Sequence, residues 1–337
     1  MKRRTKIICT LGPASSSPEI LETMIIAGMD IARFNFSHAT EEQFLQLTGS
    51  LKYIGKKHNK KIEILADLQG PRIRVGKLPP KGKELVVDET IVFTADPKNQ
   101  NDIFIDDPYL HENIEVDHPI YLVNGDIELI VTGKNDNKIT AKVIRGGVLY
   151  SRKAVNVPQT NLTTSGLTDK DLKDSSFTAA NNADYIALSF VKDASDVQKL
   201  REHIQNSSAK IIAKIERLQA LQALDGIITA SDAIMVARGD LGIEVPLEEL
   251  PLIQKDIIKR CLIQQKPSIV ATQLLMSMVN HHRPTRAEVT DVANAVLEGA
   301  WGLMLCDETS FGNYPVEAVE YLAKIIDRIE IDSPSSA

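Results

Sequence analysis

The stretch IIAKIER at residues 211–217 carries two opposite charges at the end of an apolar run. Apolar residues at 211–213 and 215 have the pattern of a buried strand, yet Lys214 and Glu216 alternate into it. Burying an ammonium or carboxylate group is costly unless the charge has a partner. We therefore expect both charges to lie where a strand leaves the core, in a polar cavity.

Polar and charged residues also stand at the ends of other predicted strands. They are Arg33, Asn35, Ser37 and His38 at the second strand, Asp67 at the third, Arg238, Gly239 and Asp240 at the sixth, Thr272 at the seventh, and Asp307 and Glu308 after the eighth. Taken singly, such a residue is more often solvated or a helix cap than catalytic. Their joint placement favours one shared site, because the strand ends of a (β/α)8 barrel form its active face.

The residue types suit a phosphorylated and carboxylated substrate. Glu216 and Asp240 supply the hard oxygen ligands that Mg²⁺ (or Mn²⁺) prefers. Arg33 and Arg74 offer forked donors for phosphate oxygens. Lys214 is a compact charge that can face a developing oxyanion. The set fits phosphoryl transfer, in which positioning and charge neutralisation carry most of the catalysis.

Eight β-rich runs alternate with helical patterns, and this order predicts an α/β protein with a (β/α)8 TIM barrel. The runs cover residues 6–11, 30–36, 63–68, 185–190, 210–215, 233–238, 267–272 and 302–306. A helix is predicted after Ser17, which suits an N-cap, and Gly28 suits its C-cap. A doubly wound open sheet is the structural alternative, which periodicity alone does not exclude.

Residues 71–158 interrupt this alternation, since they contain short alternating runs and turn signals but no long amphipathic helix. We expect a small all-β lid domain, a β-barrel, inserted after the third barrel strand. The catalytic barrel would then comprise residues 1–70 and 159–337.

Composition narrows the functional class. The chain has 337 residues and a net charge of -6, which argues against a nucleic-acid or anionic-membrane surface. No apolar run approaches the length that spans a bilayer. Its three cysteines show no disulfide or zinc spacing, so a cytoplasmic protein is expected.

Several stretches closely resemble the signature blocks of pyruvate kinase, in that family's order. They are TKIICTLGPAS, GMDIARFNFSHA, DLQGPRIR, IIAKIER, IMVARGDLGIEVP, ATQLLMSM and RPTRAEVTDVANAV. The resemblance extends over nearly the whole chain as the family's barrel and β lid, without a counterpart of its C-terminal effector domain. It implies a glycolytic phosphotransferase that converts phosphoenolpyruvate and ADP to pyruvate and ATP.

The resemblance also implies roles for individual residues. Arg33 would hold the phosphate of phosphoenolpyruvate, and Lys214 would stabilise the pyruvate enolate. The backbone at Gly239 and Asp240, with the Thr272 hydroxyl, would hold the carboxylate, and Thr272 would relay a proton. Glu216 and Asp240 would bind Mg²⁺. The residues expected at or near the nucleotide phosphates are Asn35, His38, Arg74 and Lys153.

One departure from the family concerns its monovalent cation. Many members need K⁺ and carry Thr and Glu where this chain has Leu68 and Arg72. The other residues of that pocket are Asn35, Ser37 and Asp67. We expect the fixed charge of Arg72 to replace K⁺, so that K⁺ is not required. The simpler alternative is that Arg72 only pairs with an acidic neighbour.

Two further departures lie in the lid and after the last strand. Val123 and Asn124 stand where the family usually has an acidic pair before a glycine, and CDET at residues 306–309 replaces Ser-Gly-Glu-Thr. These changes put lid closure and nucleotide preference in question. Without the C-terminal domain we expect no activation by sugar phosphates, and the barrel offers a surface for a homodimer.

Two other functions fit parts of the pattern. A non-catalytic pyruvate-kinase-like protein would sense phosphoenolpyruvate or nucleotide, but it would have no reason to retain so many buried charges. An aldolase-type Mg²⁺ enzyme would use Glu216 and Asp240, but it would leave the lid and the paired arginines idle.

Overall fold

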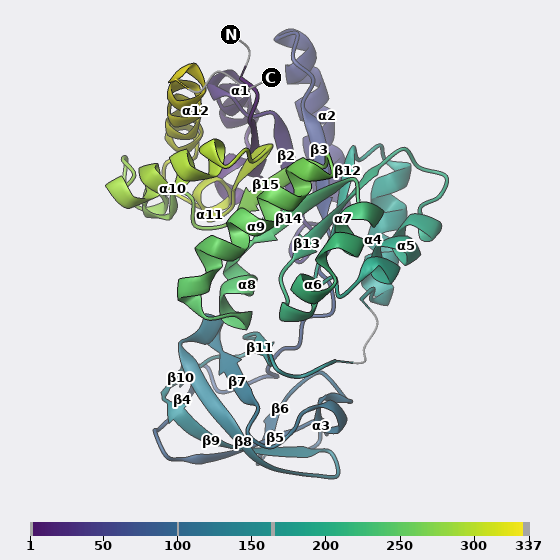
Figure 1. Cartoon of the computed structure of the whole chain (residues 1–337), viewed down its shortest axis with the longest axis vertical. Coiled ribbons are helices and arrows are strands. Elements are labelled where there is room, and N and C mark those ends of the chain that lie inside the picture. The colour runs from purple at the N-terminus through teal and green to yellow at the C-terminus, as the bar shows by residue number, and fades with distance from the viewer. Residues whose placement is uncertain (1–2, 100, 163–165, 333–337) are drawn as a thin grey trace.

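The computed structural model describes residues 3–99, 101–162 and 166–332, and its larger part is a closed barrel of parallel strands (Figure 1). The strands are β1 (Lys6–Thr10), β2 (Ile31–Asn35), β3 (Glu63–Asp67), β12 (Tyr185–Leu188), β13 (Lys210–Ile215), β14 (Ala233–Ala237), β15 (Ser268–Ala271) and β16 (Gly302–Leu305). They pair in the order β1-β16-β15-β14-β13-β12-β3-β2, which closes on itself. The predicted (β/α)8 barrel is confirmed, and the open-sheet alternative is excluded.

Helices surround these strands (Figure 1). They are α1 (Pro18–Ala27), α2 (Glu41–Lys57), α4 (Asp169–Ala180), α5 (Ala194–His203), α6 (Leu218–Gln222), α7 (Leu224–Ala230), α8 (Arg238–Glu244), α9 (Leu250–Ile263), α10 (Arg286–Leu297), α11 (Asp307–Ser310) and α12 (Pro315–Asp332). The short 3-10 helices are η1 (Pro13–Ser15), η3 (Leu247–Glu249) and η4 (Met276–Val279) in the barrel, and η2 (Val123–Gly125) in the lid. None of the helices in the described ranges is long and apolar enough to cross a membrane.

The two residues predicted to cap helix α1 do so in the structure. The Ser17 side chain accepts a hydrogen bond from the Ile20 N–H at the start of α1. Gly28 ends that helix with a φ of 132°, which few residues with a Cβ adopt. Sequence patterning did not predict α8, which begins directly at the end of β14 and carries part of the site.

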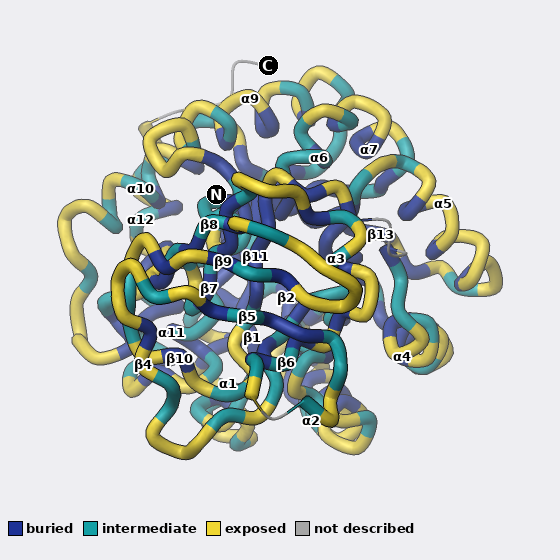
Figure 2. Tube along the Cα trace, turned by 90° about the horizontal axis from the view of Figure 1, so that it is seen from below, coloured by how far each residue is buried: buried dark blue, intermediate teal, exposed yellow. Residues whose placement is uncertain are grey.

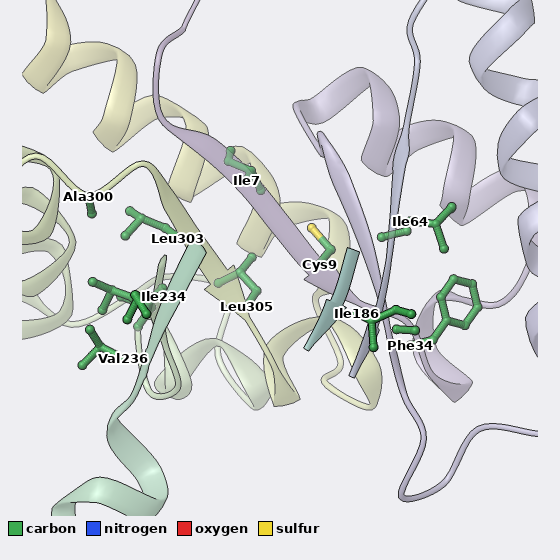
Figure 3. Close-up of a cluster of buried hydrophobic side chains, with 14 of the residues drawn as sticks. Ile7, Cys9, Phe34, Ile64, Ile186, Ile234, Val236, Ala300, Leu303 and Leu305 are labelled. Atoms are coloured by element: carbon green, nitrogen blue, oxygen red, sulfur yellow. The ribbon is translucent and has the colours of Figure 1, made fainter. Parts of the chain in front are cut away.

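Strand alternation divides the apolar residues between two sets. Ile7, Cys9, Leu303 and Leu305 belong to the large cluster that packs between the strands and the helices (Figure 3). Residues one step away along the strands form a second cluster inside the barrel, and Ile212 belongs to it. Because successive side chains of a strand point to opposite faces, Lys214 shares the interior face with Ile212.

The chain between β3 and β12 forms the lid. Its elements are β4 (Lys83–Leu85), β5 (Thr90–Thr94), β6 (Ile103–Phe104), α3 (Leu110–Asn113), β7 (Pro119–Leu122), β8 (Ile127–Asn135), β9 (Lys138–Arg145), β10 (Gly147–Leu149) and β11 (Val155–Asn156). Six strands pair in the order β11-β7-β8-β9-β5-β6, and β10 pairs with β4 as a separate sheet. These are two sheets rather than the closed lid barrel expected from the sequence.

The lid has its own buried core and lies across one end of the barrel (Figure 2). The chain enters the lid near Pro71 and returns to the barrel near Val157. The insertion therefore begins where β3 ends, at the face that the sequence assigns to the site. The exact bounds 71–158 stay a prediction.

Candidate active site

Asp67 is the centre of a buried charge cluster inside the barrel end. The Arg33 Nε donates to Asp67 Oδ2 at 2.7 Å, and the Lys214 Nζ lies 3.2 Å from Asp67 Oδ1. Lys214 also pairs with Glu216 Oε1 at 2.9 Å and donates to the Ser189 Oγ at 2.7 Å. The ends of three strands, β2, β3 and β13, thus bring together Arg33, Asp67 and the neighbouring charges Lys214 and Glu216.

The charges in this cluster stabilise one another against the cost of burial. Burial opposes ionisation of Asp67, but Lys214 and Arg33 outweigh it and hold the pKa of this carboxyl below its usual value. Burial likewise disfavours the charged form of Lys214, yet Asp67 and Glu216 outweigh it and raise the pKa of the ammonium. Both groups are therefore charged at neutral pH, and the barrel end presents fixed cations to a ligand.

The second predicted metal ligand is less enclosed than the first. Glu216 is 1% exposed, and its Oε2 accepts the N–H of Phe190 at 2.6 Å. Asp240, near the start of α8, is partly exposed and pairs with the Arg72 guanidinium. No group of three or more metal-ligating side chains occurs in the described ranges. Two hard carboxylates suit Mg²⁺, which usually takes one or two carboxylates and keeps sites for phosphate and water.

The predicted carboxylate-binding residues come from two neighbouring strand ends. A Cβ built on Gly239 would lie 3.5 Å from the Thr272 Oγ1, so the two residues are in contact distance. Thr272 and the next residue, Gln273, have φ values of 72° and 53°. Such left-handed backbone is strained for residues with a Cβ and often marks functional sites. The Arg238 Nη2 supports the turn by donating to the Thr272 carbonyl at 2.7 Å.

A cleft of about 1030 Å³ separates the barrel end from the lid, and it contains part of the predicted nucleotide site. Ser37, His38 and Gln69 line it from the barrel, and Arg74 lines it from the lid. Lys153 is exposed but does not line this cleft, whereas its neighbour Arg152 does. The volume of the cleft is large enough for a nucleotide, since ligand pockets commonly measure about 300–1,000 Å³.

Comparison with known proteins decides the family. The family model described as the pyruvate kinase barrel domain matches residues 2–319. The chain belongs to the pyruvate kinase family. The match confirms the resemblance noted in the sequence, and with it the prediction of a phosphotransferase.

Individual members of the pyruvate kinase family match nearly the whole chain. A pyruvate kinase of Thermococcus litoralis is 42% identical over 328 residues, with 96% of this chain and 69% of the relative covered. One of Sporosarcina psychrophila is also 42% identical, and the match covers 96% of this chain and 56% of the relative. A crystal structure of a pyruvate kinase from Cryptosporidium parvum superposes with a TM-score of 0.93 at 37% identity, covering 98% of this chain and 70% of that one.

Two residues of the monovalent-cation pocket that the pyruvate kinase resemblance implies, Asn35 and Asp67, are bonded to other groups of the protein. The Asn35 Oδ1 accepts the N–H of Ser37 at 3.1 Å, and both oxygens of Asp67 are held by Arg33 and Lys214. Within the described ranges, no hydrogen bond joins Arg72 to any of these pocket residues. Burial lowers the pKa of Arg72, although the nearby charges of Glu216 and Asp67 favour its charged form.

Sequence reasoning missed several residues of the site. Ser189 and Thr10 accept hydrogen bonds within the charge cluster, the Ser189 Oγ from the Lys214 Nζ at 2.7 Å and the Thr10 Oγ1 from the Arg33 Nη1 at 2.8 Å. Both lie at or directly after barrel strand ends, so a search for hydroxyls at those positions would have found them. Arg217 and Glu244 carry no such signal, because their roles depend on contacts between segments distant in the sequence.

Proposed function

We propose that the chain transfers the phosphoryl group of phosphoenolpyruvate to ADP, giving pyruvate and ATP. The observation that carries this proposal is the sharing of Asp67 by Arg33 and Lys214. One carboxylate fixes both cations at the barrel end, one for a phosphate and one for the enolate oxygen that develops as the phosphoryl group leaves. Fixed charges of this kind stabilise a transition state without reorganisation.

The remaining substrate contacts follow from the same end of the barrel. The backbone at Gly239 and Asp240 and the Thr272 hydroxyl would hold the substrate carboxylate, and Thr272 would relay a proton to the enolate. The Thr272 Oγ1 now donates to the Ala271 carbonyl at 2.6 Å, so it must reorient to meet a ligand. The residues that would contact or approach the nucleotide phosphates are Asn35, His38, Arg74 and Lys153.

Glu216 and Asp240 would hold Mg²⁺ (or Mn²⁺), which neutralises phosphate charge when bound. The donor set fits the ion, since both groups are carboxylates at one barrel end. Arg72 pairs with Asp240 in this structure, so metal binding at Asp240 requires the guanidinium to move or to share that carboxylate.

We also propose that turnover needs no K⁺. Support comes from the position of Arg72, whose guanidinium pairs with Asp240 and lies near enough to Glu216 and Asp67 for their charges to favour its charged form. Replacing K⁺ with tetramethylammonium tests this idea. Activity equal in the two salts is expected, whereas a strict dependence on K⁺ would show that the guanidinium does not replace the ion.

A coupled assay with phosphoenolpyruvate, ADP and Mg²⁺ tests the reaction itself. Lys214→Met should lower kcat at least 10²-fold, the usual effect of removing an electrostatic stabiliser of the transition state, while phosphoenolpyruvate still binds. Lys210→Met is the matched control, because Lys210 is exposed at the opposite end of the same strand. Normal turnover by Lys214→Met contradicts the mechanism.

The alternative is a non-catalytic protein that senses phosphoenolpyruvate or nucleotide. The pairing of Arg72 with Asp240 favours it, because a guanidinium competes there with a metal ion. Ligand binding without turnover of the wild-type chain in the coupled assay would establish this alternative.

A further inference from the structure

Helix α8 connects the lid with the predicted metal site. Asp240 lies in its first turn and Glu244 is its last residue. Its Ile243 lies against the lid, since a Cβ on Gly125 of η2 would be 4.0 Å from the Ile243 Cγ2. A shift of this helix would therefore move both Asp240 and the Ile243 contact with the lid. Residues that contact the C-terminal end of α8 can thus affect the position of Asp240.

Arg217 lies beside the C-terminal end of α8, since it lines the same cavity as Glu244. It is only 8% exposed, and its guanidinium carbon lies 5.2 Å from the centre of the Phe190 ring, within cation–π range. Its Nη2 lies 3.5 Å from the Pro71 carbonyl, where the chain enters the lid. Burial lowers the pKa of Arg217, and Glu244 is the charged group that most opposes this shift. Burial raises the pKa of Glu244, and Arg217 is the charged group that most opposes that shift.

A small cavity of about 30 Å³ lies among these groups at the lid hinge. Arg72, Asn156, Phe190, Arg217 and Glu244 all line it, so that it touches both connections between lid and barrel as well as α8. The Arg72 Nε and the Asn156 Oδ1 are buried there without a hydrogen bond. Polar groups of this kind are expensive to bury, which indicates that the hinge is kept polar for a reason other than stability.

Phe190 links Arg217 to the first metal carboxylate. Its N–H holds the Glu216 Oε2, and its φ of 57° is unusual for an aromatic residue. The ring lies between two guanidiniums, with the Arg72 carbon 5.4 Å and the Arg217 carbon 5.2 Å from its centre. Packing of Arg217 on this ring thus supports the backbone conformation that orients Glu216.

We propose that Arg217 and Glu244, which line the same hinge cavity, act as a pair of positioning residues that hold Glu216 and Asp240 in register and tie both carboxylates to the lid hinge. Arg217 acts on Glu216 through Phe190, and Glu244 acts on Asp240 through the single short helix that carries them. The inference rests on the proposed function insofar as Glu216 and Asp240 are taken as the metal ligands. Neither member of the pair touches the reacting atoms.

The consequence is a specific loss of metal affinity when the pair is broken. Residues that orient metal ligands typically change metal affinity 10–100-fold when they are replaced. We expect Arg217→Gln and Glu244→Gln each to raise the dissociation constant of Mn²⁺ about tenfold or more. Arg217→Lys should restore part of the affinity, since it keeps the charge but loses the planar fork.

The test titrates Mn²⁺ into the whole chain without substrate and measures free Mn²⁺ by electron paramagnetic resonance. Kinetics of the same variants should show a higher KM for the metal with kcat changed much less. The double variant should raise the dissociation constant by less than the product of the two single effects, because both residues line one cavity and neighbouring sites are not additive. Arg260→Gln is the control, since Arg260 of α9 makes exposed ion pairs with Asp225 of α7 and Asp256 of α9.

Wild-type Mn²⁺ affinity in both single variants, with only a lower melting temperature, would overturn the positioning pair. If Arg217→Gln does not fold, Glu244→Gln decides, because it keeps the side-chain shape. An inactive wild-type chain contradicts the proposed function instead, and the Mn²⁺ titration still decides the role of the pair. A wild-type chain that binds no Mn²⁺ contradicts both.

Discussion

The pH dependence of stability should depend strongly on one carboxyl group, Glu244. Burial raises its pKa from 4.5 to about 7, although Arg217 and the Leu218 N–H favour the charged form. A carboxyl whose pKa is higher in the folded than in the unfolded protein binds more protons when folded. Its contribution to the free energy of unfolding is therefore largest below the unfolded pKa and is lost as pH rises through 4.5 to about 7.

The two pKa values give the size of the effect. With 4.5 in the unfolded chain and about 7 in the folded one, raising the pH from about 5 to about 8 removes about 2.5 kcal/mol of stability. Glu244→Gln cannot ionise, so the variant should lack this component. The difference in unfolding free energy between the two proteins should thus change by about 2.5 kcal/mol across this range.

Urea denaturation of both proteins at several pH values measures that difference. Comparing the two chains at each pH cancels the titration of all other groups. Glu248→Gln is the control, because Glu248 is exposed in η3 nearby. Parallel stability curves for the wild type and Glu244→Gln would refute the argument, since they would mean that burial does not disfavour the charged carboxyl.

Two further predictions concern the charge cluster and the hinge. Asp67→Asn should cost about 3–5 kcal/mol in urea denaturation, because it leaves two buried cations without their shared partner, and a loss below about 1 kcal/mol would contradict the cluster's ionised state. Gly70→Ala should cost about 2–3 kcal/mol, because Gly70 has a φ of 72° and a Cβ there would lie 2.8 Å from Phe190. Gly49→Ala, with no atom within 4 Å of the new Cβ in mid-helix α2, should instead stabilise the chain slightly, and equal effects of the two alanines would contradict the steric argument.

Much of the barrel and part of the site follow from local sequence. Each of the eight predicted strands was found within two residues of its expected ends, because buried parallel strands are short apolar runs bounded by polar residues. The same alternation placed Lys214 and Glu216 on one face, and the barrel rule brought them to the same end as Arg33 and Asp67. These inferences need only the period of a strand and the direction of the chain.

Only the tertiary structure decided which charges became partners. The sequence left open whether Arg72 replaces a cation or pairs with an acidic neighbour, and the structure shows that its guanidinium pairs with Asp240, 168 positions away in the chain. The hinge contacts of Arg217 and the raised pKa of Glu244 likewise arise from segments that are distant in the sequence and meet only in the folded molecule. Strand periodicity is a local property of the chain, whereas burial and charge pairing depend on every element that packs around a group, and this is why they appear only in the folded molecule.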